Sequence, residues 1–189
     1  MIRLFLGVSL PFRWQKELFS IGEQMKKSVA AARWVPAKNM HITLKFLGSC
    51  DDDLPDQILA ALSIGLSDLK PFSLKLGRLG GFPSLKRVRV FWIGVVEGHD
   101  QMVDLASITE RALAPLGFEK EKRKFHSHVT LARLKKPQDL QAIIADRDLE
   151  EFEESLIAVD SIILYKSTLT PNGAIYQSLG KAPLGKHDD

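Results

Sequence analysis

The segment HITL at residues 41–44 returns as HVTL at residues 128–131, and this repeat decides how the rest of the chain is interpreted. The chain has 189 residues and five histidines. The odds that two of those histidines open an H-x-T-L segment by chance are roughly 1 in 7000. The two segments are therefore expected to be related and to share a function.

Both segments are predicted to be strands, in which successive side chains point to opposite faces. His41 and Thr43 then share one face, while Ile42 and Leu44 point into the core. In the second segment His128 and Thr130 likewise share one face, while Val129 and Leu131 point into the core. Each segment thus offers an imidazole beside a hydroxyl on a rigid element.

Working outward, the elements predicted around the two segments follow one order twice. The first half has strands at 2–9, 40–48 and 72–79, a helix from about 14 to 29, a second helix starting near Asp53, and a loop at 80–83. The second half has strands at 88–96, 127–134 and 156–166, and helices at about 100–115 and 137–147. A last strand at 174–180 has no counterpart.

An offset of 87 residues relates the two halves, which predicts a β-α-β-α-β unit present twice. We expect one domain over 1–189, with pseudo-repeats at about 1–84 and 85–189. Two similar lobes would then lie side by side, with the related segments facing each other across a central cleft.

Composition limits the class of protein. With 45% hydrophobic and 26% charged residues, the chain is predicted to fold around a real core. It lacks a run of about 18 apolar residues, and its start is interpreted as a strand, so a soluble cytoplasmic protein is expected. A lone Cys50 excludes a disulfide framework. The net charge of +3 suits an anionic ligand.

Two histidines on either side of one centre suit acid–base displacement at phosphorus. A neutral imidazole removes a proton from attacking water, and an imidazolium gives one to the departing oxygen. Both states are populated near neutral pH. The hydroxyls of Thr43 and Thr130 can donate to the non-bridging oxygens.

With these motifs the sequence resembles the two-histidine (2H) phosphoesterase superfamily, which carries paired H-x-T-x motifs. Within it, the chain is most similar to the RNA 2′,3′-cyclic phosphodiesterases, also called 2′-5′ RNA ligases. The likeness covers most of the chain, in particular RWVPAKNMHITLKFLG (33–48), GGFPS (80–84), RVRVFWIGV (87–95), FHSHVTLARL (125–134) and SIILYKSTLTPNGAIYQSL (161–179).

The resemblance implies a bilobal α+β fold in which each lobe is an antiparallel sheet backed by helices, without a metal cofactor. It implies hydrolysis of 2′,3′-cyclic phosphate ends of RNA or tRNA fragments to a 2′-phosphate and a free 3′-OH, by a monomer. By matching position, His41 is the proton donor to the leaving 3′-oxygen and His128 the acceptor that activates water. Thr43 and Thr130 hold the phosphate.

The chain departs from the family at Ser127, where members often carry proline, and this is expected to loosen the start of the strand. His126 has the strand parity of His128 and is interpreted as an exposed edge histidine, with substrate contact as the alternative. Arg133 is a candidate phosphate ligand, but strict alternation places it on the face opposite His128 unless a bulge intervenes. Lys45 has the parity of His41 and is interpreted as a solvated lysine.

Other residues are weaker candidates for a role in the site. The basic run before the second motif is interpreted as a solvated loop that could follow an RNA backbone. Three aromatic residues near the motifs could stack on a base. His99 is expected at a helix start and His187 in a frayed tail. The basic run and the aromatic residues are Lys120, Lys122, Arg123, Lys124, Trp34, Phe82 and Phe125.

Three alternatives remain open from the residues. A related enzyme could act on another small ester, such as a cyclic ADP-ribose phosphate or a 2′-5′ oligonucleotide. His41, His126 and His128 could bind a catalytic zinc ion, although no carboxylate motif accompanies them. A non-catalytic RNA-binding module would bind in a salt-dependent way without turnover.

Overall fold

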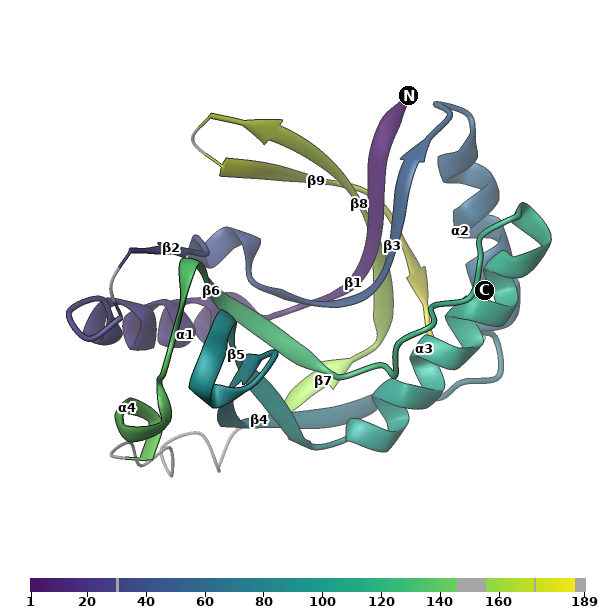
Figure 1. Ribbon diagram of the computed structural model, residues 1–189. Helices are drawn as coiled ribbons and strands as arrows, with labels where there is room; N and C mark the ends of the chain where they lie inside the picture. Colours follow the sequence, from purple (N-terminus) through teal and green to yellow (C-terminus); the bar gives the residue numbers. More distant parts are fainter. Residues whose placement is uncertain (30, 146–155, 172, 186–189) are drawn as a thin grey trace.

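The computed structural model describes residues 1–29, 31–145, 156–171 and 173–185 (Figure 1). Within these residues the strands form one curled antiparallel sheet of nine strands, in the order β7-β4-β5-β6-β3-β1-β8-β9, with β2 paired to β6. A mixed fold of antiparallel strands and helices was predicted, and that fold class is confirmed.

The elements of the first half are β1 (Ile2–Ser9), α1 (Phe12–Met25), β2 (Ala32–Trp34), the 3₁₀ turn η1 (Ala37–Asn39), β3 (His41–Cys50), α2 (Leu54–Gly65), β4 (Phe72–Phe82) and η2 (Leu85–Arg87). Those of the second half are β5 (Val88–Glu97), α3 (His99–Leu113), η3 (Ala114–Leu116), β6 (His128–Gln138), α4 (Gln141–Ala145), β7 (Ile157–Val159), β8 (Ser161–Thr170) and β9 (Gly173–Pro183).

The sheet order is symmetric under the offset of 87 residues. That offset carries β1 onto β5, α1 onto α3, β3 onto β6 and β4 onto β8, so the run β4-β5-β6-β3-β1-β8 corresponds to itself read backwards. The central pair of this run is antiparallel and joins Ile42 to Val129, which are equivalent residues. A pseudo-two-fold axis therefore passes between them, and the origin of the repeat by duplication stays a prediction.

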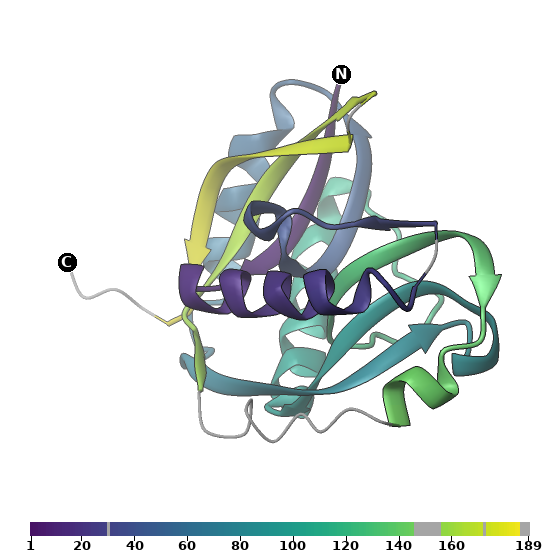
Figure 2. The same ribbon diagram turned by 90° about the vertical axis from the view of Figure 1, so that its left-hand side faces the viewer.

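The chain builds two lobes, but each half places its last long strand in the lobe of the other half. Strands β3, β1, β8 and β9 form one lobe, backed by α2 and α3, which lie side by side in Figure 1. Strands β7, β4, β5, β6 and β2 form the other, with α1 packed against β6 (Figure 2). Strand β4 thus pairs with β5, and β8 pairs with β1.

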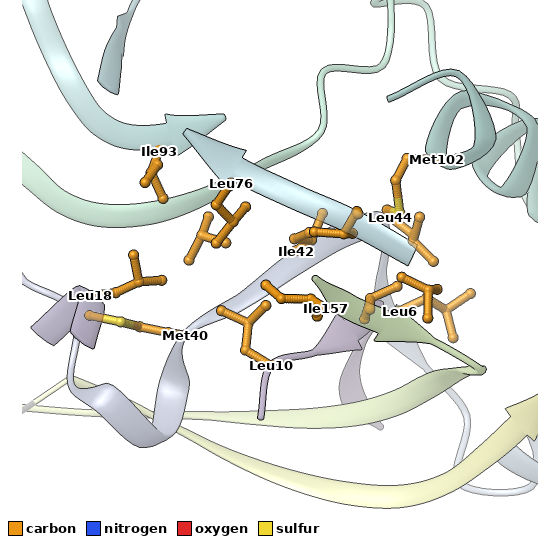
Figure 3. Packing of buried hydrophobic residues seen from close by; sticks show 14 of the residues in the cluster. Leu6, Leu10, Leu18, Met40, Ile42, Leu44, Leu76, Ile93, Met102 and Ile157 are labelled. Atoms are coloured by element: carbon orange, nitrogen blue, oxygen red, sulfur yellow. The ribbon is translucent and has the colours of Figure 1, made fainter. Parts of the chain in front are cut away.

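The core is formed by both halves together. Figure 3 shows side chains from β1, α1, β3, β4, β5, α3 and β7 facing one interior, with Ile42 and Leu44 among them. Ile42, Val129 and Leu131 are fully buried and Leu44 is 6% exposed, which confirms the inward half of the predicted alternation. The hydrophobic effect fixes the register here, because a slip of one residue would expose all four side chains.

Several predicted boundaries differ from the structure. Residues 80–82, predicted as a loop, continue β4, and the single strand predicted at 156–166 is two strands, β7 and β8. The short β2 was not predicted. Of the helix predicted at 137–147, residues 141–145 form α4, and residues 146–147 lie outside the described residues. Among the described residues, no helix has the length and apolar character to cross a membrane.

One β-bulge occurs at the same place in both halves. Gly7 and Leu6 on β1 face Thr43 and Lys45 on β3, so Leu44 is an extra residue in β3. Trp92 and Phe91 on β5 face Thr130 and Ala132, so Leu131 is the extra residue in β6. A bulge of this kind reverses the side-chain alternation beyond it, and this reversal determines which side chains reach the site.

Candidate functional site

The two motif histidines are oriented in the same way. Nδ1 of His41 lies 2.7 Å from the carbonyl oxygen of Asn39, and Nδ1 of His128 lies 2.7 Å from that of His126. A carbonyl oxygen only accepts, so each Nδ1 donates, and each neutral ring keeps the lone pair on Nε2. Asn39 and His126 are also 87 residues apart, so the same backbone arrangement supports both rings.

Strands β3 and β6 bring the two motifs together. Extending the pair Ile42–Val129 by one residue each way places His41 beside Thr130 and Thr43 beside His128. We call the side of the sheet that carries these four residues the histidine face. Oγ1 of Thr43 lies 3.0 Å from Nε2 of His41 and donates to it when the ring is neutral.

Both imidazoles are less basic than a free histidine. Burial lowers the pKa of His41 to about 4, the bond to the Asn39 carbonyl opposes this shift, and the charges of His128 and Arg133 add to it. Burial also lowers the pKa of His128, against the bond to the His126 carbonyl, and the charges of His126 and Arg133 act in the same direction as burial. Both rings are thus held neutral in the unliganded protein.

Arg133 lies on the histidine face because of the bulge at Leu131. Val90 lies opposite Arg133 and Trp92 opposite Thr130, and the two β5 residues share a face because they are two positions apart. Trp92 contacts the ring of His128, with 5.9 Å between centroids. Strict alternation, which would turn Arg133 away from His128, does not hold here; the bulge is the condition under which Arg133 was expected to reach this face.

The side chain of Lys45 also departs from strict alternation, but it points away from the histidine face instead of onto it. The bulge at Leu44 turns Lys45 away from the histidine face, and it is 4% exposed where a solvated lysine was expected. Its Nζ binds both carboxylate oxygens of Glu110 on α3, at 2.9 and 3.0 Å, and the carbonyl oxygen of Glu119 at 2.6 Å. Glu110 also accepts from the backbone N–H of Glu121.

Aromatic rings surround His41 that the sequence analysis did not single out. Phe5, Tyr165 and Tyr176 lie 4.9, 5.8 and 5.3 Å from its ring between centroids. Gly7 makes room for the imidazole, since a Cβ there would lie 3.2 Å from Cδ2 of His41 and 2.8 Å from the carbonyl oxygen of Ile42. Only long-range pairing of β1, β8 and β9 assembles this group, so no local sequence signal marks it.

A second aromatic group surrounds His128. Phe82 lies 5.1 Å from the ring of His128 and 5.1 Å from that of Trp92, and His126 lies 4.7 Å from Trp92. Of the three aromatic residues proposed for stacking, Phe82 is therefore at the site. His126 is exposed, as expected, and also touches His128 through its ring. Burial and the charge of His99 lower the pKa of His126.

Ser127 holds the start of β6 in place, contrary to the expected loosening. It is fully buried, its Oγ lies 2.7 Å from Nδ1 of His99, and its carbonyl oxygen accepts from the N–H of Val95. His99 is the first residue of α3, as predicted.

The remaining candidates lie elsewhere. Trp34 packs edge-on against Phe91 and beside Gly22 of α1, and Phe125 packs against the core. The basic run at 120–124 is exposed in irregular structure, and His187 lies outside the described residues. Across the described ranges, no group of three histidine, cysteine or acidic side chains is arranged to hold a metal ion, which does not favour the zinc alternative.

Comparison with known proteins supports the resemblance seen in the motifs. The family model for the 2′-5′ RNA ligase superfamily matches residues 16–170. A Methanocaldococcus jannaschii protein named RNA 2′,3′-cyclic phosphodiesterase is 36% identical over 182 residues, covering 93% of this chain and 97% of its own. The protein of that name from Thermotoga maritima is 34% identical over 179 residues, covering 94% and 93%.

Solved structures agree. A structure of a Thermus thermophilus protein superposes with a TM-score of 0.77 at 25% identity, covering 98% of this chain and all of the other. E. coli LigT complexed with 3′-AMP superposes with a TM-score of 0.74 at 25% identity, covering 98% and 99%. With the paired H-x-T-L segments at the centre of the sheet, these matches place the chain in a known group: it belongs to the 2′-5′ RNA ligase superfamily.

Proposed function

We propose that this protein is an RNA 2′,3′-cyclic phosphodiesterase, which opens a terminal cyclic phosphate to a 2′-phosphate and a free 3′-OH. The observation that carries the proposal is the pair of imidazoles on β3 and β6, each bound through Nδ1 to a carbonyl so that Nε2 is left for chemistry. The relatives named for this activity support the choice of substrate.

In this mechanism the two histidines act on opposite sides of phosphorus. Nε2 of His128 takes a proton from water as the water oxygen forms its bond to phosphorus. The bond from phosphorus to the 3′-oxygen breaks, and Nε2–H of His41 gives that oxygen its proton. Solvent then returns both rings to their starting states, so the cycle consumes one water molecule.

The phosphate is held by hydroxyls and a guanidinium. Thr43 and Thr130 donate to its non-bridging oxygens as negative charge develops, and Thr43 leaves Nε2 of His41 to do so. Arg133 supplies a positive charge on the same face, where it already influences both histidines. The mechanism asks for no metal ion, because the imidazoles move the protons and these donors stabilise the charge.

The bound substrate must also favour the protonated form of the donor, whose proton comes from solvent. Because the pKa of His41 is about 4 in the unliganded protein, the imidazolium form is scarce near neutral pH. An anionic cyclic phosphate against this ring favours its charged form and raises its pKa. Substrate binding is therefore coupled to the uptake of a proton by His41.

Ligation is the second candidate, favoured by the family that the chain matches. If an RNA 5′-hydroxyl replaces water as the nucleophile, the same two proton transfers form a 2′-5′ phosphodiester and release the same 3′-OH. We further propose that the protein acts as a monomer in the cytoplasm, on RNA or tRNA fragments.

Product analysis tests the proposal directly. Wild type, His41→Ala and His128→Ala are incubated with a nucleoside 2′,3′-cyclic phosphate in EDTA, and the phosphate isomer of the product is identified. Wild type is expected to form the 2′-phosphate, and each variant to lose about 10²- to 10⁴-fold in kcat. His187→Ala, at the histidine farthest in sequence from both motifs, is the matched control.

The other outcomes are decisive as well. A 3′-phosphate product would reverse the roles of the two histidines. Activity that disappears in EDTA would establish a metal-dependent reaction and overturn the mechanism. Tight, salt-dependent RNA binding without turnover would make the protein a binding module.

A further inference from the structure

Two arginines face each other across the β2–β6 pair. Arg33 of β2 lies directly opposite Arg133 of β6 in the antiparallel register, and both side chains are exposed. Residues in this relation project from the same face, with their Cβ atoms about 4.5–5.5 Å apart. Arg133 is on the histidine face, so Arg33 is on it too. Like charges directly opposite each other destabilise a sheet.

Among the described residues, no carboxylate forms an ion pair with either arginine. Strand β2 reads ARW and β6 reads HVTLARLKKPQ, so neither strand contains an acidic residue. Such an arrangement gains free energy when an anion lies between the two charges.

The arginine pair continues the line of the histidine pair. Strand β5 occupies one edge of β6, and β3 and β2 follow one another along the other edge. A ligand that lies along β6 therefore meets His41 and His128 first, and then Arg33 and Arg133. Arg133 lies three positions after Thr130, roughly 10 Å further along the strand.

The structure of an RNA end determines on which side of the reacting nucleotide the other phosphates lie. A 2′,3′-cyclic phosphate closes the 3′ end, so every other phosphate of the chain lies on the 5′ side of the reacting nucleotide. A mononucleoside 2′,3′-cyclic phosphate has no such phosphate. The paired guanidiniums can thus distinguish an RNA chain from a free cyclic nucleotide.

We propose that Arg33, beside Arg133, binds a phosphodiester on the 5′ side of the cyclic-phosphate nucleotide. Arg33 then determines specificity for RNA ends over mononucleotides, whereas Arg133 also serves the reacting phosphate. This inference rests on the proposed function and names its substrate class more closely.

The test compares two substrates with the same terminal nucleotide: the mononucleoside 2′,3′-cyclic phosphate and a trinucleotide that ends in it. Wild type, Arg33→Gln, Arg33→Lys and Arg111→Gln are assayed for kcat and KM at several salt concentrations. Arg111 is an exposed arginine of α3, the helix that Lys45 contacts on the side of the sheet away from the histidine face, so its variant makes the same charge change away from the proposed binding surface.

The expected result is specific to the trinucleotide. Arg33→Gln raises its KM about tenfold and lowers the salt slope of kcat/KM by about 0.7, while the mononucleotide changes less than twofold. Arg33→Lys keeps the salt slope, and Arg111→Gln matches wild type. Equal losses on both substrates, or no loss on either, overturn the role of Arg33. Failure of wild type to hydrolyse both substrates instead overturns the proposed function, and this inference with it.

Discussion

At the scale of single residues, the two imidazoles combine rigid placement with low basicity. Each is fixed by a carbonyl two residues earlier in the chain, and each has a pKa lowered by burial. A low pKa suits a general base, because the ring is neutral at working pH. If His41 is the donor, as we propose, the low pKa makes the reaction depend on a proton that His41 takes up from solvent when the substrate binds.

This dependence predicts a separation between two pH profiles. The profile of kcat/KM reports the free protein, and kcat reports the complex. The reaction needs His41 charged and His128 neutral, so kcat/KM should fall about tenfold for each pH unit above the free-protein pKa values of both rings, which burial lowers. The kcat of the complex, in which phosphate raises the pKa of His41, should hold to a higher pH. Steady-state kinetics between pH 4.5 and 8 would measure both, and profiles that fall together would contradict the scheme.

Also at this scale, the sequence predicts the inward residues of both motifs but not the direction of Lys45 or Arg133. Alternation in a strand is a local property, and it gives the correct faces up to Leu44 and Leu131. The extra residue at each of these positions exists only through pairing with β1 and β5. No residue type at the bulge announces it, so alternation alone assigns both later side chains to the wrong face.

At the scale of elements, the buried bond between Lys45 and Glu110 ties β3 to α3. The same lysine binds the carbonyl of Glu119, and Glu110 receives the N–H of Glu121. The segment that leads to His126 and His128 is thereby attached to the strand that carries His41. Removing one partner leaves an uncompensated charge out of water, which is more costly than losing both.

We therefore expect Lys45→Met to lower the free energy of unfolding by about 3–5 kcal/mol. The double variant Lys45→Met/Glu110→Leu should recover most of that loss, because neither charge remains buried. Urea denaturation would measure both. Arg13→Met, which breaks the exposed pair of Arg13 with Glu17, should cost less than about 1 kcal/mol as the control. A double variant as unstable as Lys45→Met would show that packing alone is responsible.

At the scale of the whole molecule, the order of elements could be predicted from the sequence, while their partition between lobes could not. Hydrophobic periodicity shows β4 at the end of the first half and β8 near the end of the second. It carries no information about partners, and pairing of β4 with β5 and of β8 with β1 is decided by the packed core. The aromatic group around His41, which includes Tyr165 and Tyr176, depends on that exchange and was missed for the same reason.

Because each half of the chain supplies a strand to the lobe of the other half, we can predict how the protein behaves when the chain is cut between the halves. A fragment of residues 1–84 lacks the β8 partner of β1, and a fragment of 85–189 lacks the β4 partner of β5. Each should be unfolded alone, and an equimolar mixture should regain β structure by circular dichroism together with cyclic phosphodiesterase activity. Division between residues 65 and 72, where the chain passes from α2 of one lobe to β4 of the other and β4 stays with β5, is the comparison. Cooperative thermal unfolding of either fragment alone would contradict the prediction.

The antiparallel meeting of Ile42 with Val129 has a consequence for how a ligand is seated. A two-fold axis offers any occupant two equivalent orientations, head to tail and tail to head. Here the two halves are not equivalent, and one difference bears on charge: Phe46, on the face of Phe5 and His41, stands where the offset of 87 places Arg133. A substrate turned end for end would set its charged backbone against a phenyl ring. This difference between the two halves thus favours one of the two orientations of a bound substrate.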